Sequence, residues 1–404
     1  MSATSDPSIT LVSEGETETR RRLEEIAADA FATPQDYLVS LSAHTLAARV
    51  DGEVVGGVVL DIVDGSAGGV GIVSWLFTSP SAQGRGVGDR LVDAALDYLV
   101  EQGCRAVVTV VQWPNTASSA LFARREFRRI SSSTLLKRFG PKQGGLVWLK
   151  TFHFVNVGCD LWYLELPGEE SLEPSGCPPE KPANATDRAT SDSGVSSSRG
   201  RQRRSPLRTA RRFSETVLVH VVLLAIVVGG LDVQSWGLTT VGLAVTAGVL
   251  LSLRWAPYAV FTSRDRRQWV FWSWGNVYPF AGAIAVFGGF LPVPGHITPE
   301  RSEWDYRDEL SVLGPAATAW GVLLLATLLG VVAMSEWVGA SGWLEAATLE
   351  SLVLTLTVFV VVDLWVIVWP FDSYNGRVVY DWNRVVWAVL SGIAALVLVV
   401  YYFG

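Results

Sequence analysis

The hexapeptide Gln83-Gly84-Arg85-Gly86-Val87-Gly88 is the stretch that decides the predicted fold of the first part of the chain. An apolar run with strand character precedes it, and a run with apolar residues at helical spacing follows it. Glycine lacks a Cβ atom, so the backbone of this turn can come close to a bound group. The free N–H groups and the dipole at a helix start attract phosphate oxygens, and Arg85 adds a positive charge. The hexapeptide therefore predicts a phosphate-binding turn between a strand and a helix.

Two other phosphate-binding motifs do not fit these glycines. A Walker A loop ends in Gly-Lys-Ser/Thr, whereas Gly88 is followed by Asp89. A dinucleotide-binding fingerprint spaces its glycines as G-x-G-x-x-G, and the spacing of Gly84, Gly86 and Gly88 differs from it. A glycine-rich turn with a purely structural role is the remaining alternative.

The neighbouring segments predict a mixed α/β domain that covers residues 1–166. Asp51-Gly52 is a pair that favours a tight hairpin turn within the region 44–63. Gly103 is expected to end the helix that follows the hexapeptide, and Pro114 precedes another helix. The expected strands are 8–13, 44–63, 69–77, 106–113, 130–138 and 146–166, and the expected helices are 16–31, 86–102 and 115–126.

The hexapeptide resembles the motif Q/R-x-x-G-x-G/A of the GNAT acetyltransferase superfamily, with Gln83, Gly86 and Gly88 in register. The strand end Trp75–Pro80 and the segment from Asn115 to Phe127 are similar to the elements that flank this motif in the superfamily, so the resemblance covers roughly residues 8–140. It implies a GNAT-like mixed sheet with flanking helices and a bound acetyl-CoA, or another acyl-CoA. The implied cofactor-binding residues are Leu76, Phe77, Thr78, Gln83, Gly84, Arg85, Gly86, Val87, Gly88, Asn115 and Phe122.

The catalytic groups that the superfamily often uses are missing from the matching positions. Phe122 stands where a tyrosine often protonates the leaving thiolate, and the strand that often holds a glutamate base offers only Ser74. Glu126 stands where a glycine is usual. His44 and His153 are further candidates for a base, with a structural role as the simpler interpretation. The resemblance therefore predicts an N-acyltransferase acting on an amine of unidentified nature, with a non-catalytic acyl-CoA-sensing regulator as the alternative.

Composition changes sharply after the first domain. Residues 167–212 are rich in Pro, Ser and Gly and predict a disordered linker, which ends in seven arginines between 199 and 212. Beside a membrane span, this arginine run favours contact with anionic lipid and a cytoplasmic position rather than nucleic-acid binding. The N-terminal domain is then expected in the cytoplasm, because residues 1–30 lack the apolar core of a signal peptide.

Long apolar runs predict an all-α polytopic membrane domain at 213–404, with five or six transmembrane helices. Each run approaches the roughly 20 residues needed to cross a bilayer. The third run is ambiguous because it contains several glycines and prolines, which suit a re-entrant segment as well as a span. The arginines of the last loop favour five spans. The candidate spans are 214–233, 237–261, 269–291, 311–334, 347–369 and 384–403.

The membrane domain resembles, in outline over 240–400, archaeal site-2-protease-like membrane metalloproteases. The segment Pro370–Asn383 is similar to their C-terminal motif, and Val293–Ile297 and Ser311–Pro315 are similar to their re-entrant hairpin and Gly-Pro helix start. The zinc ligands are absent, because Leu253–Tyr258 replaces H-E-x-x-H and Asn375 replaces the ligand aspartate. We therefore expect an inactive, metal-free pseudoprotease scaffold. Three ionisable residues fall within its predicted spans, and structural polar contacts are the simpler interpretation for them: His220, Arg254 and Asp363.

Overall fold

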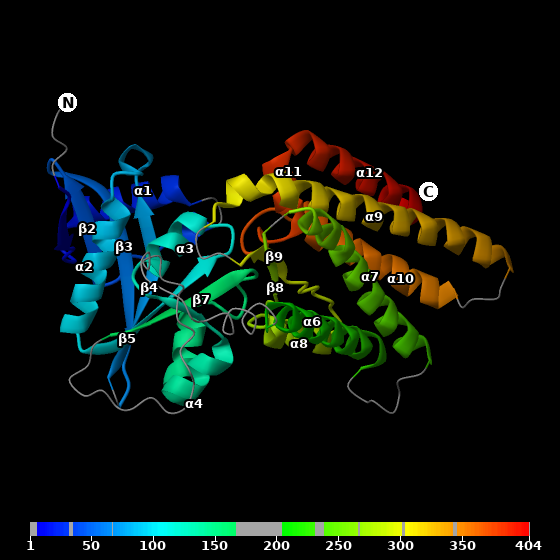
Figure 1. Cartoon of the computed structure of the whole chain (residues 1–404), viewed down its shortest axis with the longest axis horizontal. Coiled ribbons are helices and arrows are strands. Elements are labelled where there is room, and N and C mark those ends of the chain that lie inside the picture. The colour runs from blue at the N-terminus through cyan, green and yellow to red at the C-terminus, as the bar shows by residue number, and fades with distance from the viewer. Residues whose placement is uncertain are drawn as a thin grey trace, which may run out of the picture.

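The computed structural model describes residues 6–31, 35–66, 68–166, 204–230, 238–265, 267–300, 304–341 and 346–403. It shows a sheet-containing half and a helical half side by side (Figure 1). Most of the predicted linker, residues 167–203, lies outside the described residues. The predicted division into an α/β domain followed by a helical domain is confirmed for the described parts.

The first half is built on a seven-stranded mixed sheet with the order β1-β2-β3-β4-β5-β7-β6. Neighbouring strands are antiparallel except β4 and β5, which run parallel. The strands are β1 (Ser8–Leu11), β2 (His44–Val50), β3 (Glu53–Val63), β4 (Gly69–Thr78), β5 (Cys104–Gln112), β6 (Arg128–Ile130) and β7 (Cys159–Glu165).

Helices cover both faces of this sheet. They are α1 (Thr17–Ala30), α2 (Val87–Glu101), α3 (Thr116–Ala123) and α4 (Ser132–Lys150). Adjacent residues of a strand point to opposite faces, and on β3 Val58 packs with Leu91 of α2 whereas Val59 packs with Leu23 of α1. Ile72 of β4 packs with Leu135 of α4, while its neighbour Val73 joins the α2 cluster. So α1 and α4 cover one face, and α2 and α3 cover the other.

Several local predictions are confirmed. Asp51 and Gly52 have φ of 51° and 84° and join β2 to β3, as a tight hairpin turn of the primed type requires. Gly103, with φ of 72°, follows the last turn of α2.

The predicted strands at 130–138 and 146–166 are wrong over most of their length. Residues 132–150 form α4, and only short β6 and the last part of β7 are extended. The side chain of Ser131 caps the helix by accepting a hydrogen bond from the N–H of Thr134. The sequence suggested turns at Gly140-Pro141, but Gly140, with φ of 73°, only kinks the helix there.

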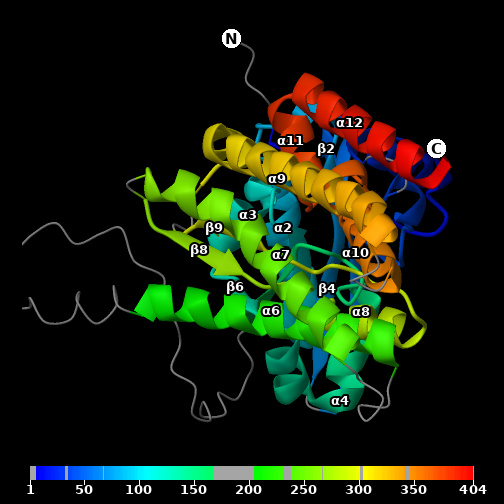
Figure 2. The same ribbon diagram turned by 90° about the vertical axis from the view of Figure 1, so that its right-hand side faces the viewer.

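The second half is mostly helical, and α9 packs against α7, α10, α11 and α12 (Figure 2). The predicted third span, 269–291, is wrong as a continuous helix. It folds into a strand and a helix of only nine residues, and the strand pairs with β9 to form a hairpin. The elements are α6 (Arg204–Gly229), α7 (Leu238–Ser263), β8 (Trp269–Trp272), α8 (Tyr278–Val286), β9 (His296–Pro299), α9 (Tyr306–Ser341), α10 (Ala346–Val360), the π-turn Val361–Trp365, α11 (Asn375–Trp382) and α12 (Arg384–Phe403).

Three helices among the described residues are long and apolar enough to cross a membrane. They are Thr209–Gly229, Tyr306–Ser335 and Arg384–Phe403, with mean hydropathies of 1.8, 2.1 and 2.3. Each overlaps a predicted span. Large apolar side chains on these helices are solvent-exposed, among them Leu218, Val322, Leu396 and Phe403, as lipid-facing surfaces are.

Candidate active site

The parallel strands β4 and β5 are paired at one end only. Their register runs from Gly69 and Cys104 to Val73 and Thr109 and then stops. The hydroxyl of Thr109 donates to the carbonyl oxygen of Val73 at 3.0 Å, at the point where pairing ends. Residues 74–78 are paired with β3 on their other side, so on the side of β5 their main-chain groups have no strand partner in the described sheet. This edge can receive hydrogen bonds from an extended ligand.

A bulge in β4 lies beside this point. Val59 pairs with Trp75 while Leu60 pairs with Val73, which leaves Ser74 as the extra residue. The hydroxyl of Ser74 donates to one carboxylate oxygen of Asp61 at 2.7 Å. The ammonium of Lys150, from α4, donates to the other oxygen at 3.0 Å.

Asp61 was missed as a functional candidate in the sequence. The available signal was a carboxylate interrupting the apolar run of β3, but nothing in the sequence indicates that Ser74 would face it.

The predicted phosphate-binding turn joins the end of β4 to α2. Gly84 and Gly86 have φ of 73° and 77°, in the left-handed region that favours glycine. Residues 83–86 are exposed, and a Cβ atom added at Gly84, Gly86 or Gly88 would meet nothing within 4 Å. Gly86 caps α2 without a side-chain hydrogen bond, so the first N–H groups of the helix have no intrahelical acceptor. The geometry is that of an open anion-binding corner.

One acid lies in the first turn of α2 and its charge is balanced. Burial raises the pKa of Asp89, but the guanidiniums of Arg124 and Arg125 outweigh this effect and hold the pKa below its usual value. Each guanidinium lies 3.1 Å from the same carboxylate oxygen. This carboxylate therefore repels an anion at the turn less than an unpaired one would.

The two predicted cofactor residues of α3 have structural partners. The side-chain oxygen of Asn115 caps α3 by accepting from the N–H of Ser118 at 3.1 Å. Phe122 is buried, and its ring packs edge-on against Phe127 with centroids 5.1 Å apart. Cofactor contact by either residue stays a prediction.

The end of α3 explains why an aromatic residue occupies position 122. The N–H of Phe127 bonds to the carbonyl of Phe122, and the N–H of Glu126 bonds to that of Ala123. This is the Schellman arrangement, which also brings the two flanking apolar side chains together. Glu126 has φ of 63° and therefore occupies the left-handed position where the sequence comparison expected glycine.

Both histidines proposed as bases have structural partners. Nδ1 of His44 lies 2.7 Å from the hydroxyl of Tyr98 on α2. Nε2 of His153 lies 3.0 Å from the carbonyl oxygen of Cys159, and burial lowers the pKa of His153 to about 4. These contacts favour the structural interpretation.

The remaining predicted residues lie along one continuous path. Leu76, Phe77 and Thr78 end β4, and residues 83–88 follow after the short turn Pro80–Ala82. The Phe77 side chain is buried on the α1 face, which leaves its main chain for ligand contact.

The helical half brings together the positions where the protease resemblance had lost its metal ligands. The hydroxyl of Tyr258 donates to the side-chain oxygen of Asn375 at 2.7 Å. The guanidinium of Arg254 forms a two-point ion pair with Asp363, at 2.9 and 3.0 Å, and Trp320 donates to the same carboxylate. Among the described residues, no group of three or more His, Cys, Asp or Glu could hold a metal ion.

His220 has a structural role in the same half. Nδ1 of this histidine lies 2.7 Å from the carbonyl oxygen of Thr216, and Nε2 accepts from the N–H of Val293. Structural contacts therefore account for His220 and Asp363, as the sequence favoured.

The two halves contact each other through the end of β5 and the loop before β7. The amide of Gln112 donates to both carboxylate oxygens of Asp372 at 3.0 and 3.1 Å, and the amide of Asn276 donates to the carbonyl of His153. Burial raises the pKa of Asp372 to about 6. Trp113 stacks on His296 with centroids 5.0 Å apart.

Comparison with known proteins concerns the first half. Mycothiol acetyltransferase from Arthrobacter sp. (strain FB24) is 36% identical over 76 residues, which are 19% of this chain and 23% of that protein. The chain thus aligns with less than a quarter of the length of this curated relative.

Solved structures with a similar region include two acetyltransferases. N-acetylglutamate synthase from Neisseria gonorrhoeae, complexed with coenzyme A and N-acetyl-glutamate, shows 18% identity and a TM-score of 0.30, covering 41% of this chain and 36% of that chain. The ribosomal-protein-S18-alanine N-acetyltransferase from Escherichia coli shows 12% identity and a TM-score of 0.29, covering 42% of this chain and 100% of that chain. Residues 12–127 match the family model described as the acetyltransferase (GNAT) family, which supports a GNAT acetyltransferase domain in this part of the chain.

Proposed function

We propose that the N-terminal domain binds acetyl-CoA, or another acyl-CoA, and transfers its acyl group to an amine. The observation that carries the proposal is the open glycine turn at the start of α2, directly after a strand edge with unpaired main-chain groups. Such a helix start binds phosphate oxygens through its N–H groups and dipole. The strand edge at 76–78 would bond the amide groups of the pantetheine arm.

The position of the thioester follows from the strand geometry. With the phosphates at 84–88, the arm runs along β4 toward the point where Val73 and Thr109 close the gap. Ser74 and Asp61 lie beside that point. The amine nitrogen attacks the thioester carbonyl, the C–S bond breaks, and the CoA thiolate leaves.

Two protons have to move in this reaction. The acceptor arrives as an ammonium and must lose a proton before it attacks. We assign this proton to the Asp61 carboxylate, reached through the Ser74 hydroxyl. Phe122 cannot donate a proton, so we assign protonation of the thiolate to water.

A second candidate function is a non-catalytic acyl-CoA sensor. It is favoured by the buried position of Phe122, where a proton-donating phenol would be expected. In that case the turn would bind acyl-CoA and the occupied domain would signal to the helical half through the contacts at Gln112 and Trp113.

One experiment separates these proposals. The full chain in detergent is titrated with acetyl-CoA by calorimetry, and then incubated with acetyl-CoA and a panel of small amines and peptide N-termini while free CoA thiol is measured. Binding with thiol release that depends on the amine supports the transferase. Binding without release across the panel favours the sensor, and no binding at millimolar acetyl-CoA rejects both.

We further propose that the helical half anchors the protein in a membrane as a multi-pass domain, with the N-terminal domain in the cytoplasm. The supporting observations are the three long apolar helices, their exposed apolar side chains and the arginine run at 199–212, which suits anionic lipid. Extraction of cell membranes with alkaline carbonate should leave the chain in the pellet. The likeness to an inactive site-2 protease concerns only this half and stays a prediction.

A further inference from the structure

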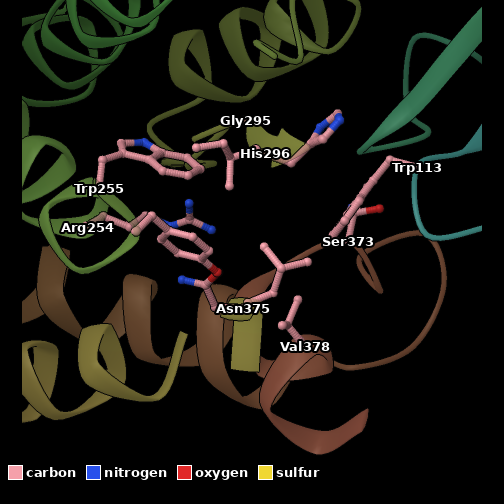
Figure 3. Close-up of a pocket in the computed structure, with 11 residues that line it drawn as sticks. Trp113, Arg254, Trp255, Gly295, His296, Ser373, Asn375 and Val378 are labelled. Atoms are coloured by element: carbon pink, nitrogen blue, oxygen red, sulfur yellow. The ribbon is translucent and has the colours of Figure 1, made fainter. Parts of the chain in front are cut away.

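A small buried cavity lies where the two halves meet. Arg254 and Trp255 come from α7, His296 from β9, Ser373 from the loop before α11, and Trp113 from the end of β5. Figure 3 shows the Arg254 guanidinium and the Trp255 ring on one side, with Trp113 and Ser373 opposite. Each of these five residues is at least nine-tenths buried.

Each of these five side chains carries a polar atom without a hydrogen-bond partner in the described part of the chain. The atoms are Nη1 of Arg254, Nε1 of Trp113, Nε1 of Trp255, Nε2 of His296 and Oγ of Ser373. Buried polar groups in folded proteins are nearly always paired, because an unpaired one has lost its hydrogen bonds to water. Five around one cavity indicate a missing partner.

Four of the five atoms can only donate. An indole N–H and a guanidinium have no acceptor capacity. His296 accepts the indole N–H of Trp274 on Nδ1 at 2.7 Å, so its proton lies on Nε2. The Ser373 hydroxyl can donate as well. The missing partner is therefore an acceptor, and a metal cation, which needs lone pairs, does not suit the lining.

The charges around the cavity favour a negative partner. Asp363 is engaged by Arg254 and Trp320. The guanidiniums of Arg129 and Arg212 lie over the ring of Trp272, at 5.2 and 4.1 Å from its centroid. Trp272 is the residue of β8 that pairs with His296.

We propose that this cavity binds an oxyanion: a carboxylate or phosphate group whose oxygens accept from the five donors. The group belongs either to a small soluble anion or to a lipid headgroup that enters from the helical half. This site is separate from the glycine turn of α2, and the inference does not depend on the proposed acyl transfer.

The test removes two donors and compares them with two matched residues. The cavity variant is Trp255→Phe with Ser373→Ala. The control is Trp365→Phe with Ser391→Ala, because Nε1 of Trp365 and Oγ of Ser391 are also buried without a partner but do not line the cavity. Both variants lose one indole N–H and one hydroxyl.

The full chain is assayed in two settings that distinguish the sources of the anion. In nonionic detergent it is titrated with sodium acetate and with inorganic phosphate at constant ionic strength. In nanodiscs it is compared in phosphatidylcholine with and without phosphatidic acid. Tryptophan fluorescence and the midpoint of thermal unfolding report binding.

We expect a saturable response to at least one probe, at least tenfold weaker in the cavity variant and unchanged in the control. A response to acetate or phosphate identifies a soluble anion, and a response to phosphatidic acid alone identifies a headgroup. The proposal is overturned if no probe gives a saturable response, or if both variants lose it equally. It is also overturned if the ligand-free cavity variant unfolds well below the control, because its donors would then already be satisfied by ordered water.

Discussion

Replacing Gly86 by glutamate is the sharpest test of the phosphate-binding turn. Gly86 has φ of 77° and open space around it, so the new side chain fits sterically and places a carboxylate in front of the first N–H groups of α2. Two unit charges 4 Å apart repel by about 4 kcal/mol at an effective dielectric constant of 20, and by about 1 kcal/mol in bulk water. For this exposed turn we take an intermediate value of about 2.7 kcal/mol, which corresponds to about a 100-fold loss of affinity.

Gly103→Glu is the matched control. Gly103 has φ of 72°, also has open space, and lies at the opposite end of the same helix. Both substitutions introduce the same left-handed strain, about 1–2 kcal/mol, but only one places a charge beside the proposed phosphates. Acetyl-CoA binding is measured by calorimetry, with circular dichroism as the check of folding. If Gly86→Glu binds within threefold of the unmodified chain, or if Gly103→Glu loses as much affinity, the assignment of the turn is wrong.

Three further predictions concern single side chains. Asp61→Asn should lower kcat for acyl transfer by about 100-fold while the Kd for acetyl-CoA stays constant; an unchanged kcat in the thiol-release assay excludes Asp61 as the proton acceptor. Glu126→Gly should stabilise the protein by about 1 kcal/mol, because it relieves a left-handed residue at the end of α3, and a lower thermal midpoint would contradict this account. Asp372 has a pKa raised to about 6 by burial, so the folded state binds its proton more tightly than the unfolded state, and stability should fall by at most about 3 kcal/mol as pH rises from about 4 to 6. The advantage of Asp372→Asn over the unmodified chain should therefore grow across that window and then level off, and a constant difference in midpoint would show that Asp372 does not titrate there.

The features predicted well from the sequence depend on residues close together in the chain. The turn at Asp51-Gly52 and the helix end at Gly103 follow from backbone preferences of one or two residues. The glycine turn at 83–88 has the same origin, since strand, turn and helix are consecutive. Glu126 belongs here too, because the positive φ at this position is set by the helix that precedes it.

The features missed by sequence reasoning depend on distant residues or on competing local signals. Gly140-Pro141 suggested a turn between two strands, but the packing of Leu135 and Val147 against the sheet holds one kinked helix together. The apolar content of 269–291 suggested a span, although its glycines and prolines divide it into a hairpin strand and a short helix. The Ser74–Asp61 pair requires the register of β3 on β4 and its bulge, which no spacing rule indicates.

The contact between the two halves decides which form of the protein is informative in assays. Trp113 is 4% exposed and lies directly after the strand that borders the proposed acyl-CoA path. Its stacking partner is His296, and Gly158 beside it leaves no room for a Cβ atom because Ser373 would lie only 2.2 Å away. Removing the helical half would expose this tryptophan and leave Gln112 without the carboxylate of Asp372. A fragment that ends at residue 166 would therefore change the end of β5 and the start of α3, where the proposed cofactor path ends. Loss of acetyl-CoA binding in such a fragment would say little about the turn at Gly86, whereas loss in the full chain carrying Gly86→Glu would bear on it directly.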